Sequence, residues 1–414
     1  MTVRGESLWR NREFAALWSG QVVSTLGAQI SGTAMPLLVL VTTGSPSAAG
    51  IVGTAGTLPF LIAHLPAGPL VDRWDRRKIL LVSELVAGLA LCTVPIAIWL
   101  GVLTVAQLAV VAFVRGLCFV FFGLAERAAL PMIVPTGLLP EAVAQNEARS
   151  RGAALAGPPL GGLLFGIDRA APFLADVLGH VIASIGLLFI RRDLRSPARP
   201  ESEPLWQAAV AGLRWIWRHP LIRAAILLIA VSNLVFHALT LVLVVLAQHQ
   251  GASAATIGVI LGIYSGGGLI GALAASRLHQ HFTPRTVIIG VNWIWAALLP
   301  LFAVASSPLL LGAVGAACAF IGPLWNVVIT TYATVLVPDE LLGRVTSAAM
   351  TMSWGVTSLA GLGAGYLLAA LGPAGSIVVL AAVALVTAII ATVSPAVRHA
   401  PPLPRPDKGP DKAT

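Results

Sequence analysis

The chain has 414 residues, of which 57% are hydrophobic and only 10% are charged. This composition, with a mean hydropathy of +0.88, exceeds what the core of a soluble globular protein requires. A net charge of +9 would suit a nucleic-acid-binding surface if the cations were clustered on soluble segments. The cations instead lie between long apolar stretches, so we expect no nucleic-acid partner.

Apolar stretches of about 20 residues or more recur along the chain, and each could cross about 30 Å of hydrocarbon as a helix. The sequence lacks the period-2 alternation that is typical of a membrane β-barrel. It therefore predicts an all-α membrane protein with twelve transmembrane helices. We place them at residues 14–41, 47–71, 79–100, 104–133, 144–167, 171–191, 221–248, 254–278, 285–305, 308–333, 342–371 and 373–395.

The cationic residues lie almost entirely on one side of these predicted spans. Of the 26 Lys and Arg residues, only Arg115 lies deep within a span, and only Arg169 lies in a loop on the opposite side. By the positive-inside rule, this asymmetry predicts a multi-pass protein of the cell membrane with both termini in the cytoplasm.

Sequence features that recur at an offset of about 200 residues predict two related six-helix halves. Gly68-x-Leu70, for example, returns as Gly271-x-Leu273. A charged, proline-rich stretch between the halves reads as a linker that leads into an amphipathic helix. We assign residues 1–190 to the first bundle, 191–220 to the cytoplasmic linker with its interfacial helix, 221–396 to the second bundle and 397–414 to a flexible cytoplasmic tail.

The stretch DRWDRRK, residues 72–78, places six charges in seven residues of an otherwise apolar sequence. A loop that only fixed orientation would not need its two acids. The pattern Gly68-x-x-x-Asp72-Arg73-x-x-Arg76-Arg77 resembles the signature loop of the major facilitator superfamily, where glycine usually occupies the position of Asp75. The chain as a whole, most strongly before residue 195, resembles the exporter branch that includes macrolide efflux proteins and the enterobactin exporter.

The resemblance implies that this loop is a cytoplasmic latch between the two halves. Asp72 would lie against the N-terminus of the span 342–371, where unpaired N–H groups favour an anion. Arg76 or Arg73 would pair with Glu126. A solvated charge cluster is the alternative. The predicted latch residues are Gly68, Asp72, Arg73, Arg76, Arg77 and Glu126.

A glycine-proline string, Gly157-Pro158-Pro159-Leu160-Gly161-Gly162, lies in the fifth predicted span. Proline removes an intrahelical hydrogen bond, and glycine allows a neighbouring backbone to approach. Ordinary small-residue packing would explain an isolated glycine pair. The whole string resembles the antiporter motif of superfamily exporters, which implies export through Gly157, Pro158, Gly161 and Gly162. We expect this kinked helix to contact the glycines Gly361, Gly363 and Gly365 of the span 342–371.

Polar side chains inside the spans are candidates for a substrate or proton pathway, because lipid makes their burial costly. The resemblance implies that spans 1, 4, 7 and 10 line a central cavity. Polar packing between helices is the alternative for each residue. The candidates are Gln21, Ser24, Thr25, Gln29, Arg115, Asp176, Asn233, His237, Trp325 and Asn326.

Proton coupling requires a carboxylate or histidine that can change protonation as its surroundings alternate between wet and dry. The candidates are Asp176 with His180 one turn later, Glu84, Glu126 and His64. Spans 3 and 6 are usually peripheral in the superfamily, which counts against Glu84 and Asp176. The coupling site therefore stays open.

We expect a secondary transporter, most consistent with proton-coupled efflux of a hydrophobic or amphipathic small molecule such as an antibiotic, drug or siderophore. A proton-coupled importer of a small metabolite and a non-transporting sensor are the alternatives. The cysteines lack metal-ligand spacing, and no phosphate loop or nucleophile elbow occurs, so we expect no metal, cofactor or enzymatic activity. We expect a monomer in the bilayer with protons as the coupling ion.

Overall fold

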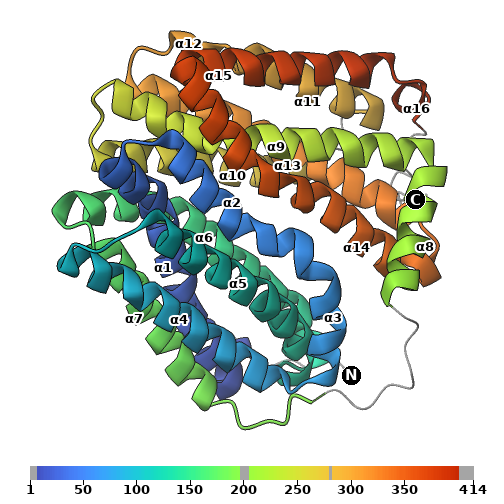
Figure 1. Ribbon diagram of the computed structural model, residues 1–414. Helices are drawn as coiled ribbons and strands as arrows, with labels where there is room; N and C mark the ends of the chain where they lie inside the picture. The colour runs from blue at the N-terminus through green and yellow to red at the C-terminus, as the bar shows by residue number, and fades with distance from the viewer. Residues whose placement is uncertain (1–6, 196–204, 279–281, 401–414) are drawn as a thin grey trace, which may run out of the picture.

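The computed structural model describes residues 7–195, 205–278 and 282–400. Within these ranges the chain is helical and contains no strand. Its helices form two bundles, one from each half of the chain (Figure 1). Part of the predicted linker, residues 196–204, and the predicted tail from residue 401 onward lie outside the described residues.

The first bundle contains seven helices, two of which are the arms of one bent span. The arms of that span are joined at an angle of 67°. The helices are α1 (Arg12–Thr43), α2 (Pro46–Ile62), α3 (His64–Arg73), α4 (Arg76–Leu100), α5 (Val105–Ile133), α6 (Leu139–Ile167) and α7 (Ala171–Leu188), with the short 3-10 turns η1 (Leu8–Arg10) and η2 (Thr136–Leu138).

The second bundle follows an amphipathic helix, α8 (Leu205–Arg218). This helix was predicted from the sequence, and it packs on α14: a Cβ on Gly212 would overlap the backbone of Arg344. The bundle consists of α9 (Pro220–His249), α10 (Ala254–Leu278), α11 (Pro284–Leu298), α12 (Leu301–Val304), α13 (Pro308–Leu336), α14 (Asp339–Gly355), η3 (Val356–Leu359), α15 (Ala360–Val393) and α16 (Pro395–Arg398).

The helices agree with the twelve predicted spans. In the described residues, nine helices are long and apolar enough to cross a membrane, and the bent pair α2–α3 makes a tenth. One of the nine, residues 344–393, is broken at Gly372, whose φ of 68° favours glycine, and it supplies two spans. The glycines, prolines and charges of α6 lower its hydropathy, yet α6 packs within the bundle between α1 and α10.

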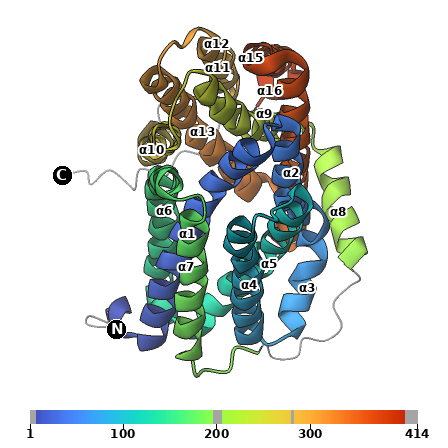
Figure 2. The same ribbon diagram turned by 60° about the vertical axis from the view of Figure 1, so that its left-hand side comes forward.

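The most extensive contacts between the halves are made by two helix pairs, and glycines set the separation of the helices in each pair (Figure 2). In the pair α2–α15, a Cβ on Gly50 would overlap the carbonyl oxygen of Gly361. Thr54 Oγ1 in the same pair accepts a hydrogen bond from the backbone N–H of Leu362 at 2.9 Å. Backbones this close require glycine, since any side chain would push the helices apart.

In the second pair, α6–α10, the glycine-proline string provides the contact. A Cβ on Gly162 would overlap the carbonyl oxygen of Ala254, and one on Gly258 would overlap that of Pro158. The predicted partner of this string was therefore wrong, because α6 packs on α10 and α1. The glycines Gly361 and Gly365 of the span 342–371 pack on α2 instead.

Both glycine contacts lie toward one end of the molecule. We call this the far side, where α1 meets α2 and α6 meets α7; the tail side holds η1, the α3–α4 turn and α8. Gly50 is the fifth residue of α2, and Gly162 is five residues from the end of α6. From these contacts the helices of the two halves diverge toward the tail side (Figure 1).

Gly162→Ala tests the α6–α10 contact. The new methyl group would meet the Ala254 oxygen, so we expect a cost of about 1–3 kcal/mol and a lower melting temperature of the purified protein. Gly166→Ala is the matched control on the same helix, because no atom of the described residues lies within 4 Å of its Cβ position. The control should be neutral or stabilising, since alanine favours helix. Equal melting of the two variants would contradict the tight contact.

Candidate functional site

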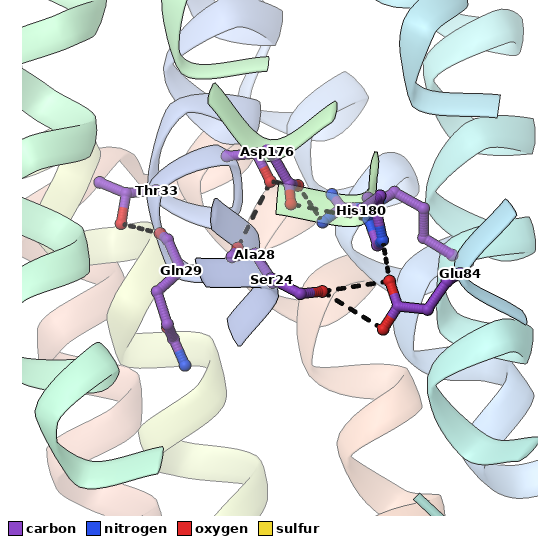
Figure 3. A network of polar contacts seen from close by, with 9 residues as sticks. Ser24, Ala28, Gln29, Thr33, Glu84, Asp176 and His180 are labelled. Carbon is purple, nitrogen blue, oxygen red and sulfur yellow. Dashed lines mark hydrogen bonds and ion pairs between the residues drawn. The ribbon is translucent and has the colours of Figure 1, made fainter. Parts of the chain in front are cut away.

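A connected set of charged and polar side chains is buried inside the first bundle, between α1, α4, α5 and α7 (Figure 3). We call it the buried network. Ionisable groups at such depth are costly unless they pair, and they usually serve a function. Its members are Gln21, Ser24, Ser31, Glu84, Arg115, Asp176 and His180.

One end of the network is the carboxylate of Asp176, which is fully buried. Arg115 Nη2 donates to Asp176 Oδ2 at 2.6 Å, and the Ser31 hydroxyl donates to the same oxygen at 2.5 Å. The other oxygen, Oδ1, has no hydrogen-bond partner among the described residues and lies 3.6 Å from His180 Nε2. Arg115 therefore compensates a charge that would otherwise stand alone in the interior.

The other end is the carboxylate of Glu84, which is 4% exposed. Gln21 Nε2 donates to Glu84 Oε1 at 2.7 Å, and the Ser24 hydroxyl donates to Oε2 at 3.2 Å. His180 Nδ1 lies 2.6 Å from Oε2. The imidazole thus stands between the two acids, with one ring nitrogen facing each.

The network depends on how closely α1 and α7 approach. A Cβ on Gly27 would lie 2.8 Å from both Cα and Oδ1 of Asp176, and one on Gly179 would lie 2.9 Å from the carbonyl oxygen of Val23. Asp176 and His180 are four residues apart on α7, so both face α1. The glycines were missed in the sequence, although Gly20 and Gly27 repeat at seven residues on α1, as do Gly179 and Gly186 on α7.

The chemistry available here is the sharing of a proton among three groups. Histidine can take a proton at one ring nitrogen and release it from the other, and the two acids face different nitrogens. Two ionised carboxylates, one guanidinium and one protonated imidazole have charges that sum to zero. The network is therefore neutral when it holds one proton more than with a neutral imidazole. Such a balance lowers the cost of holding charge in a dry interior.

The structure brings together four of the predicted pathway residues, Gln21, Ser24, Arg115 and Asp176. It joins to them Glu84 and His180. The argument from peripheral spans had counted against Glu84, and against Asp176 with His180, as proton sites. Thr25 and Gln29 are half-buried on α1 and make no side-chain hydrogen bond to the network within the described residues. Gln29 points away from Asp176 and Glu84 (Figure 3) and packs against Gly157.

The predicted residues of the second half lie apart from the network. Asn233 Nδ2 donates to the carbonyl oxygen of Ser353 at 3.3 Å. Trp325 is buried, and its Nε1 has no acceptor among the described residues, whereas Asn326 is exposed. These three residues of the second half therefore take no part in the buried network.

A row of four rings crosses from one half to the other. Phe119 of α5 lies 5.6 Å from Phe60 of α2, which lies 6.5 Å from Trp354 of α14 in stacked geometry. Trp354 in turn meets His237 of α9 edge to face at 5.9 Å. Phe119 follows Arg115 by one helical turn, so this aromatic row begins beside the cationic end of the buried network.

The predicted latch differs from the structure in its ion pairs. Glu126 pairs with Arg149 of α6 at 2.9 Å, so the predicted pairing with Arg76 or Arg73 was wrong. Arg76 instead lies 3.6 Å from Asp72 and donates to the sulfur of Met132 at 2.9 Å. Because Met132 is six residues beyond Glu126, about 9 Å along α5, Arg76 sits too near the helix end to reach that acid.

The other latch residues lie around the same turn. The Asp72 carboxylate is 60% exposed, so it is not enclosed by the predicted contact with the start of the span 342–371. Arg77 donates to the carbonyl oxygen of Leu188 at 3.1 Å, and Arg73 lines a surface groove. A Cβ on Gly68 would have no atom within 4 Å in the part of the chain that the structure describes. Among the described residues, no His, Cys, Asp or Glu group is arranged to hold a metal ion.

The sequence is similar to those of known efflux proteins. The multidrug efflux pump Tap of Mycolicibacterium fortuitum is 28% identical over 400 residues, which cover 93% of this chain and 95% of that protein. Macrolide efflux protein A of Streptococcus pyogenes is 29% identical over 180 residues, which cover 43% of this chain and 44% of that protein. These relatives confirm the resemblance to the exporter branch.

Solved structures share the fold at low sequence identity. A bacterial homologue of the iron transporter ferroportin, in an inward-facing state, has a TM-score of 0.71 at 15% identity and covers 94% of this chain and 99% of that chain. The nucleoside transporter NupG has a TM-score of 0.72 at 12% identity, covering 92% and 99%. The sequence pattern of the Major Facilitator Superfamily matches residues 17–353 and 225–414. The chain therefore belongs to the major facilitator superfamily, and it is a multi-pass membrane transporter of small molecules.

Proposed function

We propose that this protein exports a hydrophobic or amphipathic small molecule from the cell in exchange for protons. The observation that carries this proposal is the buried network, in which two acids and a histidine share one chain of polar contacts with Arg115. The multidrug and macrolide efflux relatives support the direction of transport. So does the glycine-proline string, which resembles the antiporter motif.

In this proposal the proton is held between Asp176, His180 and Glu84. Protonation of Asp176 would remove the negative charge that fixes Arg115, and the guanidinium is 17% exposed and could turn away. Loss of the proton would restore the ion pair. The position of Arg115 would thus depend on the protonation state of the network, and its movement would change the surroundings of the neighbouring aromatic row.

The substrate would lie against the aromatic row. Phe119 and Trp354 are 64% and 47% exposed, so their ring faces are available to an apolar solute. Rings and a few polar groups are typical of sites for bulky hydrophobic ligands. The row spans both halves, so a bound solute would contact each half at once.

Transport would follow alternating access, with the halves rocking about the substrate. The two glycine contacts would close the far side while the tail side is open, and they would separate when the tail side closes. The excess of cations on the tail side supports a cytoplasmic location for both termini, in the cell membrane. We propose a monomer as the transporting unit.

Asp176→Asn and Glu84→Gln test proton coupling. Both variants keep shape and remove a titratable group, so we expect proton-driven efflux of a labelled macrolide from cells lacking their own pumps to fall to background. Glu147→Gln is the control, because Glu147 is 63% exposed and its ion pair within the described part of the chain is with Arg151 on the same helix. In everted vesicles, an inside-acid gradient should drive uptake in wild type. Gradient-independent flux, or flux of the opposite sign, would refute proton-coupled export.

The Arg115–Asp176 pair predicts a non-additive stability change. Arg115→Gln leaves a buried carboxylate uncompensated, and breaking such a pair costs about 3–5 kcal/mol. Adding Asp176→Asn removes that charge, so the double variant should melt at a higher temperature than Arg115→Gln alone. The idea is wrong if the two single effects simply add.

The latch proposal concerns turnover. If Asp72 stabilises one of the two conformations, Asp72→Asn should lower the transport rate about fivefold or more while leaving substrate affinity nearly unchanged. Asp193→Asn is the control, because its exposed carboxylate lies on the same side at 4.0 Å from Arg195. Wild-type transport by Asp72→Asn would leave the charged loop with a topological role alone.

A further inference from the structure

A groove of about 590 Å³ lies on the first bundle, between α4 and α5, and none of its lining residues is a member of the buried network. Its walls are apolar side chains of the two helices, and Val82 and Val86 are 56% and 40% exposed. Ser83 lines this groove, whereas the next residue, Glu84, faces the network on the other side of α4. The apolar wall is made by Ile79, Val82, Val86, Leu117 and Phe121.

The mouth of the groove is cationic. Arg73, Lys78 and Arg195 surround it, and Asp75 is the single acid among its described lining residues. Asp75 is already engaged, because it accepts from the Arg77 N–H at 3.0 Å and lies 3.9 Å from Arg195. Within the described residues, neither Arg73 nor Lys78 pairs with a carboxylate. These four described side chains therefore have a net charge of +2, and two of the cations are ready for an anion.

The dimensions fit one leaflet of a bilayer. From Arg76 at the start of α4 to Val86 is ten residues, about 15 Å along the helix. This is about half of the 30 Å hydrocarbon core. Trp74, which is 54% exposed at the mouth, is a residue type that prefers the headgroup level. The groove thus runs from the level of the headgroups toward the middle of the membrane.

We propose that this groove binds an anionic phospholipid. The phosphate would lie among Arg73, Lys78 and Arg195, and one acyl chain would lie along the apolar wall. Basic pockets between transmembrane helices on the cytoplasmic side are suited to anionic headgroups. A neutral hydrophobic solute would gain nothing from three cations, and a soluble anion would gain nothing from the apolar wall. An anionic phospholipid has a charged headgroup for the cationic mouth and an acyl chain for the apolar wall.

Native mass spectrometry of the full-length protein, with phosphatidylglycerol or phosphatidylcholine added to the detergent, tests this assignment. Wild type should retain phosphatidylglycerol more strongly. The double variant Lys78→Gln/Arg195→Gln should reduce that retention on the order of tenfold and leave phosphatidylcholine unaffected. Val86→Trp, which fills the groove, should reduce retention of both lipids. None of these residues belongs to the buried network, so binding is read independently of transport.

The matched control is Arg10→Gln/Arg285→Gln, which removes two exposed cations on the same side of the molecule, away from the groove. It should leave lipid retention at the wild-type level. Equal retention of the two lipids by wild type would overturn the proposal. So would equal loss of phosphatidylglycerol in both double variants, because the effect would then come from overall charge.

Discussion

The burial of the Asp176 carboxylate constrains the whole first bundle. A charge in a dry interior needs a close counter-charge, and Arg115 provides it at 2.6 Å from a different helix. That contact fixes α5 against α7, while Ser31 fixes α1 to the same oxygen. Gly27 and Gly179 are needed because the acid fits only where the backbones of α1 and α7 nearly touch. Packing and electrostatics therefore specify the same arrangement.

Glycine has two uses in this fold. Within the first bundle, Gly27 and Gly179 hold α1 and α7 together beside a paired charge, which resists separation. Between the halves, Gly50 and Gly162 bring α2 to α15 and α6 to α10. Those interfaces contain backbone contacts and hydrogen bonds between neutral groups, such as Leu362 N–H to Thr54 Oγ1 at 2.9 Å, and among the described residues no ion pair lies at these glycine contacts. Such an interface can separate at low cost, whereas the charged one cannot.

Hydropathy, loop charge and the signature loop were enough to predict the membrane class, the twelve spans and the superfamily. These three properties depend on local patterns of residues, which the sequence shows directly. Helix partners were harder. The glycine-proline string that begins at Gly157 does not show which helix packs against it, α10 or the span 342–371. The sequence does not show which arginine lies level with Glu126 on α5: Arg149 of α6 pairs with it, whereas Arg76 lies beside Met132. Glu84 was disfavoured as a proton site because its span was expected to be peripheral. The Glu84 side chain nevertheless faces α1 and α7, inside the bundle.

The division of polar groups between the halves has a mechanical consequence. In the described residues the paired acids of the membrane interior belong to the first bundle, and the second bundle offers Asn233, His237 and Trp354 at the interface. A proton held by the network would therefore move within one rigid body. Two packed faces lead from it to the other half: the aromatic row that begins at Phe119, and α6, which packs on α1 and on α10. If protons drive transport as proposed, their effect would cross these packed faces, since the network itself ends within the first bundle.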